Sequence, residues 1–450
     1  MPDPVLHDAR PCPECAEALP DSGHHTSWCP ACEWNLSPAA AQPYRPPREQ
    51  RRQARAERKE QSRRTAVRSR VEKLYGALAT DPGARGGGAA FGTLLLATLV
   101  HLSTLSLFAG SLTALALGPL PLRVLGLIGA ALVTIALRPR LGRLVKDNSL
   151  LSRADAPALH GLADRVAAAL GTRPVHAIRV TGAFNASYGR VGLRRRSVLS
   201  IGLPLWHVLT PQQRVALLAH ELGHAVNGDA RRGLWLGAAL DTLGAWIGLL
   251  RPDHSRARRF GRRRAWGPEQ GIAHIAELAT KLIFGLFAEL ARLVLALLDR
   301  LTTRSGQAAE YRADASAATT ASTEAALGML ETLLLDTSAR TVITRFRNTP
   351  AKAHRAGTHP QQQSADLWTA LADQLAAVPP LERERLLRVS ARELGAVDVS
   401  HPPTYLRMRM LALRPVAAAE ATVVLGTAES ARVEEELAPA RRRFANSVAG

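Results

Sequence analysis

The sequence predicts a mainly α-helical chain with a small β-sheet, preceded by a hydrophobic helical hairpin and a small cysteine-containing ribbon. Three observations lead to this prediction. Helical periodicity dominates after residue 150, with two short β-branched segments among the helices. A run from Gly86 to Leu122 contains no charged residue, and all four cysteines lie between Cys12 and Cys32. At 450 residues the chain exceeds the roughly 250–300 residues at which single cores stop growing, so more than one domain is expected.

The first element, residues 1–38, contains two Cys-x-x-Cys pairs, Cys12 with Cys15 and Cys29 with Cys32. Thirteen residues separate the pairs, a spacing typical of a structural zinc ribbon in which four thiolates complete a tetrahedral site. Two disulfides are the alternative. Because the cysteines are confined to this short segment, we expect a reducing compartment and one structural zinc ion.

Residues 39–87 are rich in Pro, Arg and Glu and form a basic linker or helix. The chain's formal charge of +20 indicates an anionic partner, either lipid or nucleic acid. The run Arg45–Arg70 contains no aromatic residue on which bases could stack. Nucleic acid is therefore disfavoured and membrane lipid favoured, with a solvated charged segment as the remaining alternative.

A transmembrane hairpin is expected at residues 88–138. Ala89–Leu117 exceeds the ~20 residues that cross a bilayer as a helix, and Val124–Leu137 approaches that length if its flanking residues join it. Arginine and lysine residues flank both ends, which favours a multi-pass protein with both ends in the cytoplasm. We see no secretory signal peptide, so the N-terminus is also expected in the cytoplasm. A core hairpin of a soluble protein is the alternative.

A mixed domain is predicted at residues 139–415, followed by a tail at 416–450. An amphipathic helix is expected near Ala156–Leu170, with strands at Val175–Val180 and Ser197–Ile201. Two further apolar segments occupy Gly233–Leu250 and Ile272–Leu298 but include acidic and basic residues. We predict that this apolar pair (residues 233–298) forms a cytoplasmic or interfacial hairpin packed on the active site, because the loop between them is rich in arginine.

The segment LTPQQRVALLAHELGHAVNGD begins at Leu209 and contains the residues with the clearest chemistry. Thr210 and Gln213 form a capping box that starts a helix. His220 and His224 then lie one turn apart on one face, where two imidazoles can bind one metal ion. Glu221 lies beside them, where a carboxylate can accept a proton from a metal-bound water. The spacing predicts a catalytic zinc site with Glu221 as general base.

A catalytic zinc needs a third protein ligand, and Glu310 in AAEYRADASAA is the best candidate. Asp314 shares its helix face, so one carboxylate could bind the metal while the other orients a ligating histidine. The alternative for Glu310 is a solvated helix glutamate.

These motifs together resemble the HtpX-like membrane metallopeptidases, relatives of the CAAX prenyl endopeptidases. HELGHAVNGD starts at His220 and EYRAD at Glu310, while FNASYG starts at Phe184 and SHPPTYLRMRML at Ser400. The resemblance implies a zincin-type metallopeptidase domain. It also implies zinc bound by His220, His224 and Glu310, with Glu221 as base and Asp314 supporting a ligand. Asn185 and His401 would border the substrate or the oxyanion.

Two functional hypotheses follow. The first is a membrane zinc endopeptidase that cleaves membrane or membrane-proximal proteins, in keeping with a role in protein quality control. The second is a membrane-tethered zinc-ribbon scaffold with an inactive peptidase fold. The presence of Glu221 favours the enzyme, because a scaffold needs no base beside its metal. Substrate specificity and oligomeric state cannot be predicted from these motifs.

Overall fold

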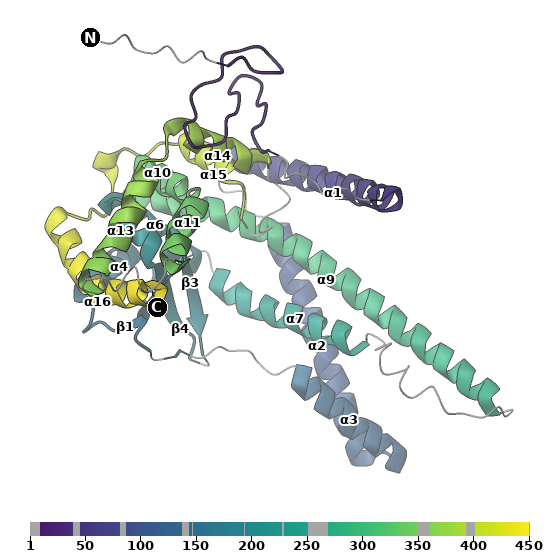
Figure 1. The fold of residues 1–450 in the computed structure, drawn as a ribbon. Coiled ribbons are helices and arrows are strands. Elements are labelled where there is room, and N and C mark those ends of the chain that lie inside the picture. Colours follow the sequence, from purple (N-terminus) through teal and green to yellow (C-terminus); the bar gives the residue numbers. More distant parts are fainter. Residues whose placement is uncertain are drawn as a thin grey trace, which may run out of the picture. The chain divides into compact units, whose positions relative to one another are not determined.

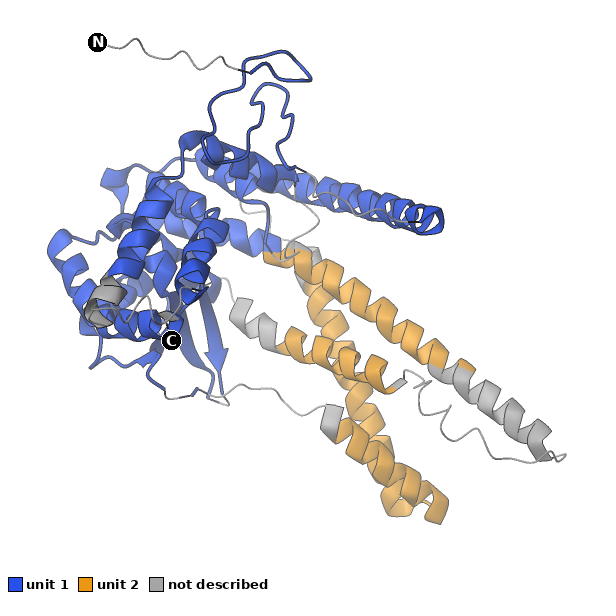
Figure 2. Cartoon of the chain, in the orientation of Figure 1, with its two compact units in different colours: residues 1–83, 143–227, 307–450 blue, residues 84–142, 228–306 orange. Residues whose placement is uncertain are grey.

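The computed structural model confirms a mainly helical chain with a small mixed β-sheet (Figure 1). It describes residues 10–38, 46–81, 87–136, 144–145, 147–192, 194–226, 229–250, 269–348, 360–392 and 401–449. The described residues form two compact units. Unit 1 comprises residues 1–83, 143–227 and 307–450, and unit 2 comprises residues 84–142 and 228–306 (Figure 2).

The sheet of unit 1 has four strands in the order β1-β2-β4-β3. These are β1 (Leu150–Leu151), β2 (Ala177–Thr181), β3 (Ala186–Val191) and β4 (Arg196–Gly202). β2 and β4 are parallel, with Ile178 opposite Leu199, whereas β1 and β3 run antiparallel to their neighbours. The two predicted strands correspond to β2 and β4, and β3 was not predicted. β3 forms one edge of the sheet.

Unit 1 also contains the following helices, together with the last part of α9 (Glu269–Ala321). They are α1 (Pro47–Thr80), α4 (Pro157–Ala169), α5 (Leu203–Val208), α6 (Pro211–Val226), α10 (Thr323–Leu333), α11 (Asp336–Asn348), α13 (Pro360–Ala376), α14 (Pro380–Arg392), α15 (Thr404–Ala412), the short 3₁₀ helix η1 (Ala418–Glu420) and α16 (Thr427–Ala449). Apolar residues of α4, the sheet and α6 form one core, with Leu159, Ile178, Leu199 and Leu218 fully buried. This burial fixes α6, which contains the predicted histidines, against the sheet.

Helix α16 belongs to the same core, since Val433 and Leu437 are fully buried in it. The Glu436 carboxylate also accepts hydrogen bonds from the backbone N–H groups of Ala158 and Leu159, at 2.6 and 2.9 Å. These two groups lie in the first turn of α4, which has no side-chain cap of its own. A carboxylate at this position satisfies free N–H groups and complements the helix dipole.

We expect Glu436→Ala to destabilise unit 1 by about 1–2 kcal/mol, the usual cost of losing a helix N-terminal cap. The thermal unfolding midpoint of the purified chain should fall by about 2–8 °C. Glu435, which is exposed on the same turn of α16, gives the matched control. Equal midpoints for Glu436→Ala and Glu435→Ala would contradict the capping role.

Unit 2 consists of α2 (Gly87–Leu117), α3 (Leu120–Ala136), α7 (Asp229–Leu250) and the first part of α9 (Glu269–Ala321). Among the described residues, one helix is long and apolar enough to cross a membrane, at Phe91–Leu117, and Leu120–Thr134 is a shorter apolar helix. We expected a hairpin of two spanning helices. By length and composition, only its first helix is able to cross a membrane.

The apolar segments at 233–298 pack against α2. Ala97 and Val100 of α2 share a buried cluster with residues of α7 and with Leu298 of α9. The Trp235 indole donates to Thr98 Oγ1 at 3.1 Å, and the Trp235 carbonyl lies 2.9 Å from His101 Nε2. The structure places these helices in unit 2 with α2, and the expectation that they pack on the active site stays a prediction. This cluster buries only part of the apolar surface, since Leu282, Leu286 and Leu293 of α9 are exposed.

Candidate metal centre

The predicted metal-binding helix α6 begins with the expected capping box. Thr210 N–H donates to Gln213 Oε1 at 3.0 Å, and Gln213 N–H lies 3.4 Å from Thr210 Oγ1. From this start, His220 and Glu221 are buried and His224 is partly exposed. The rings of His220 and His224 are 5.0 Å apart and perpendicular, so the two imidazoles converge without stacking.

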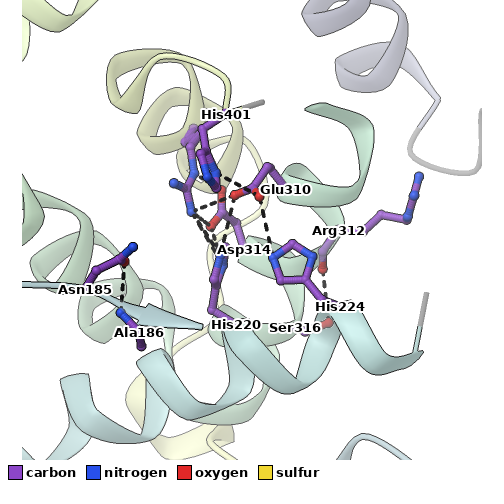
Figure 3. Close-up of polar contacts among 10 residues, drawn as sticks. Asn185, Ala186, His220, His224, Glu310, Arg312, Asp314, Ser316 and His401 are labelled. Atoms are coloured by element: carbon purple, nitrogen blue, oxygen red, sulfur yellow. Dashed lines mark hydrogen bonds and ion pairs between the residues drawn. The ribbon is translucent and has the colours of Figure 1, made fainter. Parts of the chain in front are cut away.

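Glu310 of α9 reaches both imidazoles (Figure 3). Its Oε2 lies 3.5 Å from His220 Nε2, and its Oε1 lies 3.5 Å from His224 Nε2. The ligand atoms of these three residues all lie within 4.8 Å of one another. Two nitrogens from one helix and a carboxylate from another thus face a common point, as the residues of a three-ligand metal site must.

Asp314 lies one turn beyond Glu310, and its Oδ1 is 3.0 Å from His220 Nδ1. Arg407 of α15 donates to both Asp314 oxygens, at 2.6 and 2.8 Å, and its Nη2 is 3.6 Å from Glu310 Oε2. A proton held on Nδ1 by Asp314 leaves the Nε2 lone pair of His220 directed towards Glu310. The arrangement suits Nε2 for binding a metal ion.

The charges in this region favour a cation. Burial lowers the pKa of His220, yet the carboxylates of Asp314 and Glu310 outweigh burial and raise that pKa to about 9. Burial raises the pKa of Glu310, but its cationic neighbours hold it well below the usual range. The site contains three carboxylates, those of Glu221, Glu310 and Asp314, and one guanidinium, that of Arg407. Its formal charge is therefore −2 when the histidines are neutral. Surroundings that attract a proton to His220 also attract a divalent cation.

A buried oxygen atom without a hydrogen bond gives a further test of whether a metal ion fits this site. Glu310 Oε2 is buried and makes no hydrogen bond with any residue that the structure describes. His220 Nε2 and Arg407 Nη2 lie 3.5 and 3.6 Å from this oxygen, but neither makes a hydrogen bond with it, and a bound metal ion would satisfy it. With two imidazole nitrogens facing it, the donor set matches the ligands that zinc prefers.

The two remaining predicted residues differ in their placement. His401 Nδ1 lies 2.9 Å from Glu310 Oε1, so His401, just before α15, contacts the candidate metal-binding group. Asn185 is exposed at the start of β3, and its side-chain oxygen accepts from the Ala186 N–H at 2.9 Å. In Figure 3, Asn185 lies apart from the cluster around Glu310. The roles of both residues stay predictions.

A model of peptidase family M48 matches residues 154–414, which is more than half of the chain and includes every residue of this cluster. The chain belongs to peptidase family M48. Members of the family are zinc-dependent peptidases, in agreement with a donor set of two histidines and a glutamate. No curated protein and no solved structure matches the chain.

The cysteine ribbon preceding the M48 domain offers a second group that could hold a metal. Cys12 and Cys32 have their sulfur atoms 3.5 Å apart, as do Cys15 and Cys29, and all four cysteines are free. The four sulfurs lie within 4.8 Å of one another. The two pairs also have matching backbone bonds, since the N–H of Ala16 donates to Cys12 O and that of Glu33 to Cys29 O. Four converging sulfurs fit a structural zinc site.

Arg407 is the member of the M48 cluster to which sequence reasoning assigned no role. It lies in the SHPPTYLRMRML segment, in which the resemblance assigned a role only to His401. Its contact with Asp314 spans 93 positions along the chain, and no local pattern links the two. The guanidinium is buried with three carboxylates near it, and their charges raise its pKa although burial lowers it.

Helices α6 and α9 approach each other closely at Gly223. A Cβ atom on Gly223 would lie 3.1 Å from Ala313 Cα and 3.2 Å from the Ser316 side chain. Gly223 therefore limits the separation of the two helices that contribute His220, His224 and Glu310.

We expect Gly223→Ala to force α6 and α9 apart by a few tenths of an ångström, with about 1–3 kcal/mol of overpacking strain. Zinc affinity, measured by competition with a chelator, should fall about tenfold. Gly161 in α4 has open space around it and gives the matched control. An unchanged affinity in Gly223→Ala would show that the helix separation does not limit metal binding.

Proposed function

We propose that this chain is a membrane-anchored zinc endopeptidase that cleaves membrane or membrane-proximal proteins. The observation that carries the proposal is the convergence of His220, His224 and Glu310 within an M48 domain, next to the buried Glu221. We also propose that it serves protein quality control, the role that we expected from the resemblance.

In this proposal His220, His224 and Glu310 hold the zinc ion. When bound, the ion supplies a Lewis acid that polarises a peptide carbonyl and makes a water molecule easier to deprotonate. The Glu221 carboxylate takes the proton of the attacking water and passes it to the leaving amine. Asp314 keeps the Nδ1 proton on His220, and Arg407 holds Asp314 in place. His401 is close enough to Glu310 to border the reacting carbonyl.

The edge strand β3 supports a peptide as substrate. Among the described residues β3 pairs with β4 alone, so we propose that the backbone N–H and C=O groups of its other edge are available to an extended peptide. Asn185 precedes this strand, a position consistent with its proposed contact with substrate. Protein or peptide substrates are therefore the partners that we propose for the site.

Membrane anchoring is proposed through α2 and α3. Unit 1 contains residues from before α2 and residues between α3 and α7, and both contact the last part of α9, since the Tyr75 and Tyr311 rings are 6.4 Å apart and His220 lies beside Glu310. Both segments must then lie on one side of the membrane, and residues 84–142 must cross it twice or not at all. A crossing by α2 thus requires a return through α3 and its flanking residues. The basic flanks favour the cytoplasm as the shared side.

The contact between α2 and α3 is consistent with a membrane hairpin. A Cβ atom on Gly126 would meet the Ser111 carbonyl oxygen at 2.5 Å, and one on Gly129 would meet Ser111 Oγ at 2.5 Å. Small residues that permit such close approach are typical of helix pairs in membranes. We further propose that the exposed arginines of α1 rest on anionic lipid headgroups.

The position of the loop between α7 and α9 can be measured directly. Residues 251–268 lie outside the described part of the chain, and our expectation from sequence is that this arginine-rich loop stays in the cytoplasm. A cysteine placed at Ser255 should then react with an impermeant thiol reagent only after the cells are opened. Labelling of intact cells would show that α7 and α9 cross the membrane beside α2.

The proposed function is tested on the purified, detergent-solubilised full chain. We expect two zinc ions per chain, hydrolysis of casein, and loss of hydrolysis after chelation. Changing both Cys12 and Cys15 to serine should remove one zinc ion and retain the other. A chain with two zinc ions that cleaves neither casein nor itself would favour the scaffold hypothesis.

A further inference from the structure

The cysteine ribbon is attached to the peptidase unit through its second Cys pair. Trp28 and Cys29 are fully buried, while in the first pair Cys12 is buried and Cys15 is exposed. The surface that covers Trp28 is α14, whose Arg388 guanidinium lies 5.1 Å from the centre of the indole ring. A guanidinium over a tryptophan face is a favourable cation–π contact.

Polar contacts accompany this stacking. Arg388 Nη1 donates to the Pro30 carbonyl at 2.7 Å, and Arg385 Nη1 donates to the Leu36 carbonyl at 2.7 Å. Arg388 and Arg392 both pair with Glu33, which lies directly after Cys32. Three arginines along α14 thus bind the loop of the second Cys pair and the residues after it. This surface of the ribbon is therefore covered within the chain.

From α14 the contacts continue to the metal centre. The Tyr405 N–H, in the first turn of α15, lies 3.3 Å from Ser390 Oγ of α14. Arg407, half a turn further along α15, holds Asp314 and lies 3.6 Å from Glu310 Oε2. The ribbon, α14 and α15 form a continuous series of contacts that ends on the ligand glutamate.

We infer that the ribbon is an intramolecular brace that holds α14 and α15 in place, with Arg388 as a positioning residue for Arg407. The inference rests on the proposed peptidase function for its kinetic consequence only. The four cysteine sulfurs fix the conformation of the second Cys loop and of the carbonyl groups to which Arg388 and Arg385 donate hydrogen bonds. Loss of that conformation makes α14 more mobile. It also makes α15, the helix that contains Arg407, more mobile.

The test compares wild type with Arg388→Ala, which retains all four cysteines, and with a Cys29→Ser/Cys32→Ser variant. Hydrogen exchange of α14 and α15 should become at least about tenfold faster in both variants, whereas exchange in α4 should stay unchanged. Arg340 on α11, which pairs only with Asp336 in the described contacts, gives the matched arginine control. Hydrogen exchange is measured without substrate, so it tests the brace independently of peptidase activity.

The kinetic readout separates positioning from general instability. We expect kcat on a peptide substrate to fall about tenfold in Arg388→Ala with KM within about twofold and catalytic zinc retained, because the contacts that this variant removes lie on α14 and not on β3. Arg388→Lys should recover part of the loss, since it keeps the charge but not the planar fork. Unchanged exchange in α14 and α15, or changes confined to residues 10–38, would overturn the inference.

Discussion

Glu221→Gln should lower peptide hydrolysis by about 10²–10⁴-fold while leaving two zinc ions on the chain. Glutamine has the shape of glutamate but cannot accept a proton at pH 7, so the base is lost. His220, His224 and Glu310 remain, so the metal stays. Casein hydrolysis and zinc content, measured on the same preparations of wild type and variant, check the two halves of this expectation.

Glu324 is exposed on α10 and gives a control for the same chemical change. Glu324→Gln should keep full activity. A Glu221→Gln chain with more than about a tenth of wild-type activity would remove Glu221 from its role as base, since general bases contribute far more than that. A variant that lost zinc would instead show that Glu221 supports the metal site itself.

Glu310→Ala should lose both the catalytic zinc and the activity. Glu310 contributes the carboxylate that faces both histidine rings, and its removal leaves two nitrogen ligands. Two ligands hold zinc far more weakly than three. Metal analysis should therefore give one zinc ion per chain, retained by the ribbon, and hydrolysis should fall to background.

Asp314→Asn gives an informative comparison, because Asp314 contacts His220 and not the metal position. Loss of such a supporting carboxylate typically weakens metal binding by 10–100-fold, which excess zinc can overcome. Activity of Asp314→Asn should recover in added zinc, whereas that of Glu310→Ala should not. Full activity of Glu310→Ala with two zinc ions would mean that another residue is the third ligand.

The sequence could predict those parts of the site that depend on local residue patterns. The Thr210–Gln213 capping box starts α6, and the helical repeat then puts His220 and His224 one turn apart. The same repeat pairs Glu310 with Asp314. These relations depend on backbone geometry within one helix, so they needed no tertiary information.

The parts that could not be predicted depend on distant contacts. β3 contains Ser187, Gly189 and Arg190 and is partly exposed at the sheet edge, so it lacks the apolar alternation of a half-buried strand. The packing of α7 on α2 brings together residues more than 130 positions apart. Composition shows that both helices are apolar, but only the fold shows which surface each one covers.

The place of α16 in the core has a consequence for the order in which the protein matures. Translation produces His220, Glu310 and Asp314 more than a hundred codons before it produces Val433 and Leu437, which complete the core. A nascent chain that has already exposed its metal ligands still lacks Glu436 at the start of α4. We expect the peptidase unit to reach its folded state only after α16 has been synthesised, so a nascent chain that ends before Val433 should lack the completed core around α4 and α6.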